Sequence, residues 1–394
     1  MKIGLLITYF HPFRDGTENQ ALYWCSELAT KHEVHVFTSD RRGNEILKDK
    51  YENYNGLHIH RYKTLFRYKY YLCWNWKLIV DLLKADLDIL HVHSLGFVQQ
   101  DLAVLILKLL KPNLAIVNFP HGPFLANENY SAPVKLFREF YRVIEKSLIN
   151  GLYDSILDCN GNQKTTWMPR YFPNLNKVKY CPDGIPKDRF QKVDSKDFVK
   201  KYDLKNKFVI VHLGRLVKYK GQEQTLKILP DILQKHKNVI YMVIGSDRGY
   251  KTELEQLAKQ LQVENNVIFT GEISEEDKLK AFDSAQVVVF TSAPGTEAFG
   301  IVTLEGMARK CAAVSSEILG GNTAVIHNET GFVYKYDDLE SLKNYILQLI
   351  EDKKLLKKFQ EASYERAKQF VNEDIVWKYL EPLYLEAIQG VKAK

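Results

Sequence analysis

Short apolar runs alternate with amphipathic stretches along the chain, and this alternation constrains its fold more than any other feature. The apolar runs fall at residues 2–8, 34–38, 89–92, 115–119 and 155–159 in the first half, and at 208–213, 239–244, 267–270, 287–291 and 312–315 in the second. Runs of this length are typical of strands buried on both faces of a parallel sheet. Amphipathic stretches between them, such as 20–30 and 78–84, indicate covering helices, so we expect an α/β protein with doubly wound sheets.

The length of 394 residues and a polar, lysine-rich stretch at 186–207 together predict two domains. A chain of this length exceeds what one hydrophobic core usually serves, and the stretch lacks the apolar pattern of a strand. We therefore expect one Rossmann-like domain at 1–190 and a second at 191–372. Ligands of such sheets bind beyond the carboxyl ends of the strands, so functional residues should follow strands and line a central cleft between the two facing domains.

Asp15 and Gly16 follow the first predicted strand and precede a helix expected from about Asn19. A glycine here allows backbone N–H groups to approach a phosphate, which the positive end of a helix attracts. A simple turn would use Gly16 equally well. The local pattern therefore leaves both interpretations open.

Two cations follow the strand predicted at 208–213. Arg215 and Lys220 lie between Gly214 and Gly221, just before a helix expected from Gln222. Fixed positive charge beside a helix N-terminus suits a diphosphate, and the flanking glycines favour close backbone approach over a solvated basic loop. We expect this loop to bind phosphate.

The segment after the strand at 287–291 carries the most specific pattern in the chain. Glu297 falls in the loop and Glu305 on the following helix, while Phe299, Gly300 and Ile301 supply backbone N–H groups at the helix start. Two such carboxylates can bracket a ligand by accepting hydrogen bonds from its hydroxyls while the amides hold its phosphate. Either glutamate alone would more often be a surface residue or a helix cap.

An ordered set of motifs spans nearly the whole chain. Its members are Asp15-Gly-Thr-Glu18, Asp88-Ile-Leu-His-Val-His93, His121-Gly122, Val178-Lys-Tyr-Cys-Pro-Asp-Gly-Ile185, Gly214-Arg215 with Lys220-Gly221, Glu297-Ala-Phe-Gly with Glu305, and Gly320-Gly321 before Thr330-Gly-Phe-Val333. In this order they resemble the retaining GT-B glycosyltransferases of glycosyltransferase family 4 (glycosyl transferases group 1). The resemblance implies a GT-B fold in which a C-terminal helix at 373–394 returns to the first domain.

The resemblance also implies roles for the residues singled out above. Arg215 and Lys220 match positions that neutralise the donor diphosphate, and Glu305 matches one that binds the nucleotide ribose. The segment that holds the donor sugar and its phosphate is matched by Glu297, Phe299 and Gly300, with the amide of Ile301 at the helix start. His121 matches a first-domain histidine that reaches the transferred sugar, and Gly16 matches the loop that closes over the diphosphate.

The implied reaction is retaining transfer of a hexose-type sugar from a nucleotide diphosphate, UDP more often than GDP, to a glycan or lipid-linked acceptor. Negative charge develops on the departing oxygen, and a positioned Arg and Lys with helix-start amides can stabilise it without a metal or other cofactor. His121, Arg215, Lys220 and Glu297 are the expected catalytic residues. A sugar-nucleotide epimerase of the same fold and a catalytically silent sugar-nucleotide-binding subunit stay open as alternatives.

Two positions depart from the family pattern. Asp15 stands where a second glycine is usual, which alters the closing loop or places a carboxylate near the acceptor. Thr323 and Ala324 stand where Pro-Glu is usual, so one structural or donor-side contact differs. Asp15 and His93, which follows the strand at 89–92, are the acceptor-side candidates.

No metal site, membrane span or nucleic-acid partner is expected. Asp86-Leu-Asp88 imitates an Asp-x-Asp metal motif but precedes a strand, and His91 and His93 lack further ligands at zinc spacing. The apolar stretch at 102–110 is far shorter than the roughly 20 residues that span a bilayer. Five scattered cysteines without a secretion signal are most simply reduced thiols, so we place the protein in the cytoplasm.

Residues 57–80 contain no acidic residue and mix cations with aromatic rings. The cations are Arg61, Lys63, Arg67, Lys69 and Lys77. Leu65, Tyr68, Leu72, Trp76, Ile79 and Leu83 recur at helical spacing, which predicts packing on the sheet. Rings with cations also suit a membrane interface, so we hypothesise peripheral membrane contact through 61–77.

Overall fold

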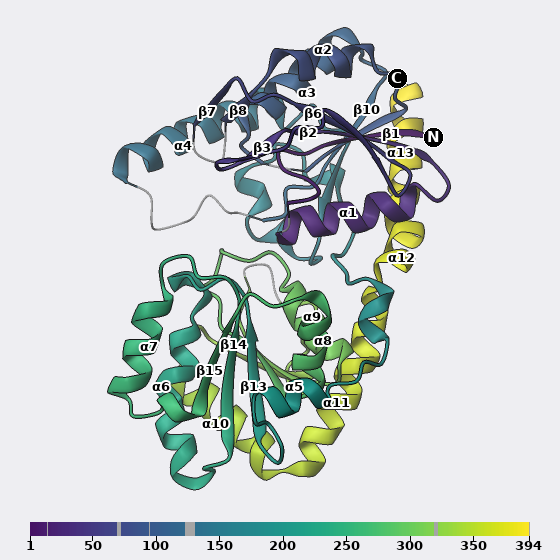
Figure 1. Cartoon of the computed structure of the whole chain (residues 1–394). Coiled ribbons are helices and arrows are strands. Elements are labelled where there is room, and N and C mark those ends of the chain that lie inside the picture. The colour runs from purple at the N-terminus through teal and green to yellow at the C-terminus, as the bar shows by residue number, and fades with distance from the viewer. Residues whose placement is uncertain (14, 69–71, 94, 123–130, 319–321, 394) are drawn as a thin grey trace. The chain divides into compact units, whose positions relative to one another are not determined.

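The computed structural model describes residues 1–13, 15–68, 72–93, 95–122, 131–318 and 322–393. The chain forms two compact units, each a sheet with helices on its faces (Figure 1). The N-terminal unit contains residues 1–183 and 372–394, and the C-terminal unit contains residues 184–371. Residues 184–190, which we expected in the first domain, thus belong to the C-terminal unit.

The N-terminal unit is built on an eight-stranded sheet in the order β12-β11-β10-β9-β1-β2-β6-β5. In that order the strands are Val178–Tyr180, Ser155–Asp158, Ala115–Asn118, Ile89–Val92, Lys2–Leu6, Glu33–Ser39, Leu57–Tyr62 and Tyr51–Tyr54. Neighbours run parallel except β5 and β6. The five apolar runs of the first half all form central strands, whereas β5, β6 and β12 are more polar strands toward the sheet edges.

The helices of this unit are α1 (Gly16–Leu28), α2 (Trp76–Lys84), α3 (Val98–Leu110), α4 (Ala132–Ile144), α12 (Asn372–Ile375) and α13 (Glu381–Lys392). Two π-helical turns, Glu145–Ile149 and Val376–Leu380, extend α4 and join α12 to α13. Helix α13 packs against β10, and its Tyr384 hydroxyl lies 2.5 Å from Nδ1 of His91 on β9. The end of the chain is therefore part of the first core.

The predicted helical packing of residues 65–83 is wrong in its first half. Phe66–Tyr68 (β7) and Leu72–Trp74 (β8) form an antiparallel hairpin, and a helix begins only at Trp76. Leu65 is 63% and Trp76 55% exposed, whereas Ile79 on α2 is buried. Aromatic residues favour strands, and here that preference overrides the helical spacing. Residues 69–71 lie outside the described residues.

The C-terminal unit is built on a six-stranded, wholly parallel sheet in the order β15-β14-β13-β16-β17-β18. In that order the strands are Val267–Gly271, Val239–Ile244, Phe208–Leu213, Val287–Phe290, Ala312–Ser316 and Gly331–Tyr334. The covering helices are α5 (Lys196–Lys201), α6 (Gln222–Lys235), α7 (Lys251–Gln260), α8 (Glu275–Asp283), α9 (Ile301–Ala308), α10 (Leu339–Glu351) and α11 (Lys353–Ala367). The first and fourth strands of this unit, β13 and β16, are direct neighbours, so the segments that follow them meet at one edge.

Close packing fixes helix α9 on this sheet. A Cβ atom at Gly306 would lie 2.8 Å from the side chain of Val288 on β16, so only glycine lets the helix approach so closely. The opposite face of the sheet, with Ile210, Val287, Val289 and Val314, forms one core with the inner faces of α6 and α10. The N-terminus of α9 is thereby held rigidly at the carboxyl end of β16.

No helix within the described ranges combines the length and apolar character needed to cross a membrane.

Candidate functional site

The loop after β13 touches the loop after β16 through their backbones. Gly221 adopts a left-handed conformation (φ +68°), and a Cβ atom there would lie 2.1 Å from the carbonyl oxygen of Thr291. The Thr291 hydroxyl donates to the carbonyls of Lys220 and Gly221 at 2.9 Å, and the Ala293 N–H donates to the Tyr219 carbonyl at 2.8 Å. Glycine at 221 is therefore required by this backbone contact, whereas the close approach expected from the sequence was to a phosphate.

Lys220 and Glu297 form an ion pair across these two loops. Their Nζ and Oε1 atoms are 2.5 Å apart, and the side chains are 12% and 22% exposed. Two residues that the sequence placed in separate phosphate-binding and sugar-binding segments are thus brought together. At this exposure the pair stays accessible to a ligand while each charge keeps a partner.

Arg215 lies in the same loop as Lys220. Its guanidinium donates to the Tyr219 hydroxyl at 2.8 Å, and its carbonyl accepts from the Gln222 side chain at 3.0 Å. Tyr219 was not predicted as a site residue, since a tyrosine between two lysines carries no distinctive pattern. Its hydroxyl holds the arginine beside the start of α6.

The start of α9 is shaped by Gly300 and Phe299. Gly300 caps the helix in a left-handed conformation (φ +83°), and Ile301 is the first helical residue. Phe299 is buried and packs edge-on against Phe370 with ring centroids 5.6 Å apart. The first N–H groups of a helix have no partner within it, so this end offers donors for an anion.

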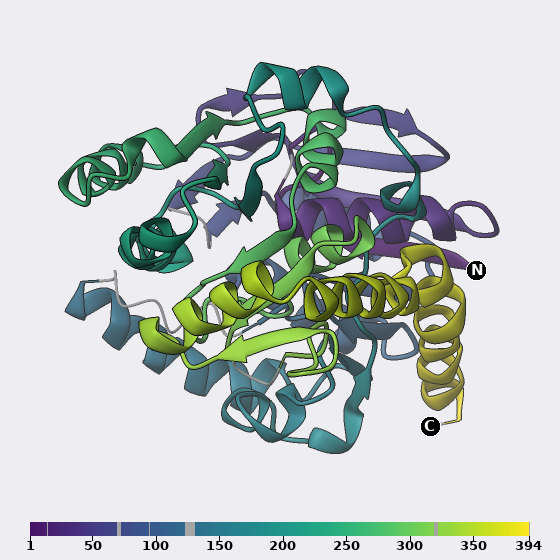
Figure 2. The ribbon, with the colours of Figure 1, turned by 90° about the horizontal axis from the view of Figure 1, so that it is seen from below.

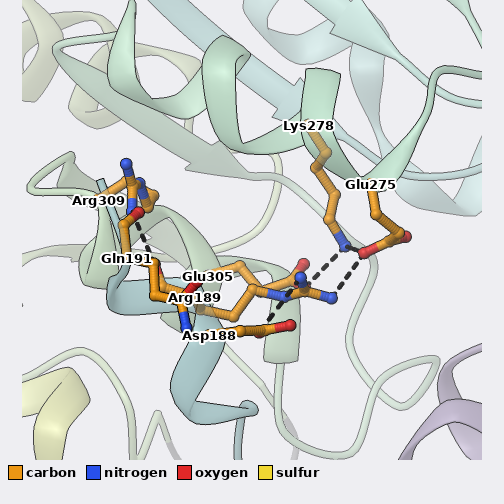
Figure 3. Close-up of polar contacts among 7 residues, drawn as sticks. All are labelled: Asp188, Arg189, Gln191, Glu275, Lys278, Glu305 and Arg309. Carbon is orange, nitrogen blue, oxygen red and sulfur yellow. Dashed lines mark hydrogen bonds and ion pairs between the residues drawn. The ribbon is translucent and has the colours of Figure 1, made fainter. Parts of the chain in front are cut away.

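Glu305, on helix α9, is paired with two cations. Its Oε1 lies 2.8 Å from Nζ of Lys278 and 3.3 Å from Nε of Arg189. Figure 3 shows both cations beside this carboxylate. Glu275 bridges the same cations, at 2.6 Å from Arg189 and 2.9 Å from Lys278. Burial opposes the charge on Lys278, but the carboxylates of Glu305 and Glu275 outweigh it and raise the pKa of the ammonium.

The expected ribose-binding carboxylate is therefore also part of a buried charge cluster. Its side chain is only 9% exposed, and those of Arg189 and Lys278 are 5% and 12% exposed. Sequence reasoning missed both cations, because Arg189 lies in the polar stretch assigned to a linker and Lys278 in an ordinary charged helix. A ligand that binds between Glu297 and Glu305, as predicted, would meet two carboxylates that already pair with cations: Glu297 with Lys220, and Glu305 with Lys278 and Arg189.

Asp15 has a structural role that the sequence did not reveal. Helix α1 begins at Gly16 rather than near Asn19, and the Asp15 carboxylate caps it by accepting from the Gly16 N–H at 3.3 Å. The same carboxylate pairs with Arg42 at 2.7 Å. A Cβ atom at Gly16 would meet nothing within 4 Å, so the local fold does not require glycine there.

His93 and His121 lie in contact beneath the carboxyl edge of the first sheet. Nε2 of His121 is 3.0 Å from Nδ1 of His93, and the rings of Trp24 and Phe119 enclose them. Burial lowers the pKa of His121 to about 3 and that of His93 well below its usual range. Both imidazoles are thus neutral near pH 7, and His121 can act as a hydrogen-bonding group rather than as a cation.

Thr323 and Ala324, the second departure from the family pattern, pack within the C-terminal unit. Ala324 is buried, and the carbonyl of Thr323 accepts a hydrogen bond from Arg366 at 2.7 Å. Gly320-Gly321, the motif before them, lies outside the described residues. Asn322 ties this segment to the sheet by donating to the Ser316 carbonyl at 2.8 Å.

The acidic pair that imitates a metal motif is engaged at the start of the first strand. Asp88 accepts from the Lys2 N–H at 2.8 Å, and Asp86 pairs with the Lys2 ammonium at 3.2 Å. In the part of the chain that the structure describes, no three or more His, Cys, Asp or Glu side chains are grouped so as to hold a metal ion.

Two helix-covered sheets of mainly parallel strands are the architecture of a GT-B glycosyltransferase. Residues 14–186 match the family described as Glycosyltransferase Family 4, and residues 194–366 match Glycosyl transferases group 1. The chain belongs to the GT-B glycosyltransferases of family 4, as its motifs predicted.

Relatives and solved structures are similar along nearly the full length. The chain is 23% identical over 402 residues to the glycosyltransferase MJ1069 of Methanocaldococcus jannaschii, covering 96% of each. It is 23% identical over 405 residues to the N-acetyl-alpha-D-glucosaminyl L-malate synthase of Bacillus anthracis, covering 100% of this chain and 99% of that one. Anabaena HepE, solved with UDP and glucose, superposes with a TM-score of 0.75 at 19% identity, covering 97% and 99%.

Proposed function

We propose that this glycosyltransferase transfers a hexose-type sugar from a nucleotide diphosphate donor with retention of anomeric configuration and without a metal or other cofactor. The observation that carries the proposal is the Lys220–Glu297 pair at the backbone contact between the loops after β13 and β16. In such a site the donor diphosphate replaces Glu297 as the partner of Lys220. The released Glu297 carboxylate then accepts hydrogen bonds from the sugar hydroxyls.

Each residue has one task in this scheme. Arg215 and Lys220 stabilise the charge on the departing diphosphate oxygen, together with the amides at the start of α9. Glu305 binds the ribose, and neutral His121 donates or accepts a hydrogen bond at the transferred sugar. Gly16 belongs to the loop that closes on the diphosphate.

UDP is the preferred nucleotide in this proposal, with GDP as the second choice. HepE, a protein of the same fold, has been solved with UDP-glucose, which supports this order. Thermal-shift screening of the purified protein against a panel of UDP- and GDP-sugars tests it, because only a tightly bound donor stabilises the folded form measurably. Stabilisation by none of them contradicts the proposal.

The roles of the two glutamates can be separated by calorimetric titration with UDP. Glu305→Gln should weaken UDP binding at least about tenfold, comparable to loss of one charged hydrogen bond. Glu297→Gln should not weaken UDP binding, since it frees Lys220 for the diphosphate, but it should slow transfer, because the released Glu297 carboxylate contacts the sugar. Equal effects of both variants on UDP binding would overturn this division.

The acceptor is proposed to be a glycan or a lipid-linked glycan met in the cytoplasm. Formation of a new glycoside from donor and acceptor distinguishes transfer from epimerisation, which needs no acceptor. Hydrolysis of the donor by the purified protein alone distinguishes an enzyme from a silent binding subunit.

Peripheral membrane contact through 61–77 also stays a proposal, in a revised form. Leu65, Phe66 and Trp76 are more than half exposed beside the exposed cations Lys63 and Lys77. Arg61 has to be removed from the expected set, because it is buried and paired with Glu52. Lys69 lies outside the described residues. Liposome flotation of a Lys63→Gln/Lys77→Gln variant tests the contact, and binding equal to that of the wild type would reject it.

A further inference from the structure

Three segments of the C-terminal unit meet at Glu305. Glu305 lies on α9, Lys278 on α8, and Arg189 in the 3₁₀ turn Lys187–Phe190. In Figures 1 and 2 these segments can be followed by colour, from teal at the turn to green at the two helices. All three belong to residues 184–371, so their meeting depends on the fold of this unit alone.

Both cations approach the same oxygen of Glu305. The Lys278 ammonium donates to Oε1 at 2.8 Å, and Nε of Arg189 lies 3.3 Å from that same atom. No hydrogen bond from a described residue reaches the second carboxylate oxygen, Oε2. The carboxylate is thus held by one oxygen, while the other keeps its capacity to accept.

The two cations are themselves held in place by Glu275. Its Oε2 accepts from Arg189 at 2.6 Å and lies 2.9 Å from Nζ of Lys278. The side chain of Glu275 is 44% exposed, whereas those of the other three residues are between 5% and 12% exposed. The cluster therefore has an exposed end at Glu275 and a nearly buried end at Glu305.

Arg309 fixes the turn that carries Arg189. Its guanidinium donates to the carbonyl of Arg189 at 3.0 Å and to that of Gln191, which Figure 3 shows beside it. It also pairs with Asp283 at the end of α8. Because Arg309 directly follows α9, the helix that carries Glu305 also anchors the turn that reaches it. The position of Arg189 is therefore set by the backbone around it.

A carboxylate fixed in this way can distinguish a ligand that has a hydroxyl group from one that lacks it. A mobile glutamate would turn toward water when the hydroxyl is missing, whereas a fixed one is left unpaired. A site built to bond a hydroxyl rejects the analogue without it for this reason. The selectivity of such a site depends on the groups that hold the carboxylate still.

A purely structural role explains these contacts less completely. Lys280, also on α8, offers the comparison, since its Nζ lies 3.0 Å from the carboxylates of Asp197 and Glu276, whose side chains are each 70% exposed. Lys278 and Arg189 instead converge on a carboxylate whose side chain is 9% exposed. An almost buried carboxylate that keeps one oxygen without a hydrogen bond is suited to a donor supplied by a ligand.

We propose that Lys278 and Arg189 are positioning residues that fix Glu305 so that Oε2 accepts from a ribose hydroxyl of the donor. The site thereby selects ribonucleotide donors over deoxyribonucleotide donors such as deoxythymidine diphosphate sugars. This inference rests on the ribose role proposed for Glu305, and it assigns the selectivity to two cations that sequence reasoning missed.

Calorimetric titration with UDP, 2′-deoxy-UDP and 3′-deoxy-UDP tests the proposal. GDP and its deoxy analogues replace them if the thermal-shift screen selects a guanosine donor. The wild type should bind at least one deoxy analogue at least about tenfold more weakly than the parent nucleotide, comparable to loss of one charged hydrogen bond. Lys278→Met should reduce this ratio to less than about threefold, mainly by weakening the binding of the parent nucleotide.

Lys280→Met is the matched control. Lys280 lies on the same helix, its side chain is 10% exposed against 12% for Lys278, and it likewise bridges carboxylates. This variant should keep the wild-type ratio, and so should Lys278→Arg, which keeps the charge and the donors. Initial rates give a second readout, because Lys278→Met should raise KM for the donor and leave kcat within about threefold.

The outcomes separate this inference from the proposed function. A wild type that binds neither nucleotide, or that binds the parent and both deoxy analogues equally, would overturn the ribose role of Glu305 and this inference with it. A ratio that Glu305→Gln abolishes but Lys278→Met leaves unchanged would overturn only the positioning role. An equal loss in Lys280→Met would assign the effect to loosening of α8 and would also reject that role.

Arg189→Lys guards against misfolding of Lys278→Met, because it keeps the positive charge in the cluster. One ammonium cannot reach Glu305 and Glu275 from separate nitrogens, as the guanidinium does. The ratio should therefore fall by at least about threefold in this variant. A ratio equal to that of the wild type would contradict the positioning role of Arg189.

Discussion

Nζ of Lys220 and Oε1 of Glu297 lie 2.5 Å apart where the loops that follow β13 and β16 meet. The two strands are neighbours in the sheet, although their paired residues Ile210 and Val287 are 77 positions apart in the chain. The register between the strands fixes where the loops meet. The pair thus connects the segment expected to hold phosphate with the segment expected to hold sugar.

Replacement of Lys220 by Met should lower the rate of transfer by at least about a hundredfold, comparable to loss of a donor that stabilises an oxyanion. Glu297→Gln should produce a fall of similar size. Lys218→Met is the matched control, because Lys218 is an exposed lysine in the same turn, and it should change the rate by less than about threefold. Initial rates with saturating donor provide the measurement, and near-normal rates for Lys220→Met would remove the assignment.

Gly221→Ala should destabilise the C-terminal unit, whereas Gly16→Ala should not destabilise the N-terminal one. An added Cβ at 221 meets the Thr291 carbonyl in a left-handed backbone, while one at 16 meets no atom within 4 Å. Alanine is also the better helix residue at the first position of α1, by up to about 1 kcal/mol. Urea unfolding measures both effects. A loss of transfer in a fully stable Gly16→Ala protein would assign Gly16 to the closing loop, and an unaltered Gly221→Ala stability would refute the contact.

Arg189→Met should lower the free energy of unfolding of the C-terminal unit by roughly 3 kcal/mol, because it leaves buried carboxylates without one of their cations. Lys310→Met removes an ion pair with Glu361 in which both side chains are about half exposed, and should cost less than about 1 kcal/mol. Urea denaturation of the two variants beside the wild type makes the comparison. Similar costs would show that the Glu305 cluster is no more than a surface network.

Acid should destabilise the N-terminal unit through its buried histidines. Burial lowers the pKa of His91 and of His121 to about 3, below the roughly 6.5 of an unfolded histidine. The folded state therefore binds fewer protons than the unfolded state in this range. The contribution of these histidines to the free energy of unfolding is complete above about pH 6.5 and is lost as the pH falls toward about 3.

His91→Gln should reduce the slope of stability against pH by up to about 1.4 kcal/mol per pH unit between about pH 6 and about pH 4. Tyr384→Phe is the control, since it removes the hydrogen bond to His91 but keeps the titrating ring. Urea titrations across this pH range measure the slopes. Parallel slopes for His91→Gln and the wild type would show that His91 does not govern the acid response.

The sequence predicted those parts of the fold that depend on local apolar patterns. All ten apolar runs became strands, nine of them inside a sheet and one, β15, at a sheet edge. The loops after β13 and β16 lie at the carboxyl ends of parallel strands, where the sequence predicts ligand-binding residues. The hairpin β7–β8 was missed because its apolar residues coincide with helical spacing over a short stretch. The polar strand β6 was missed because its buried residues alternate with partly exposed histidines.

The sequence predicted candidate site residues, but not which residues they contact in the fold. Asp15 could not be recognised as a helix cap paired with Arg42, because that pairing depends on a residue from another strand end. The Arg189 and Lys278 partners of Glu305 come from distant parts of the chain, so no spacing rule marks them. His93 and His121 were singled out separately, but only the adjacency of β9 and β10 places their rings in contact.

The final helix completes the first core, and this has a consequence for how the protein is made. Everything from Gly184 to Val371 is inserted between the two parts of the N-terminal unit. The ribosome must therefore synthesise the whole C-terminal unit before Tyr384 can contact His91. A fragment ending at residue 183 would lack the Tyr384 hydroxyl that contacts His91, so the unit whose synthesis starts first is completed last.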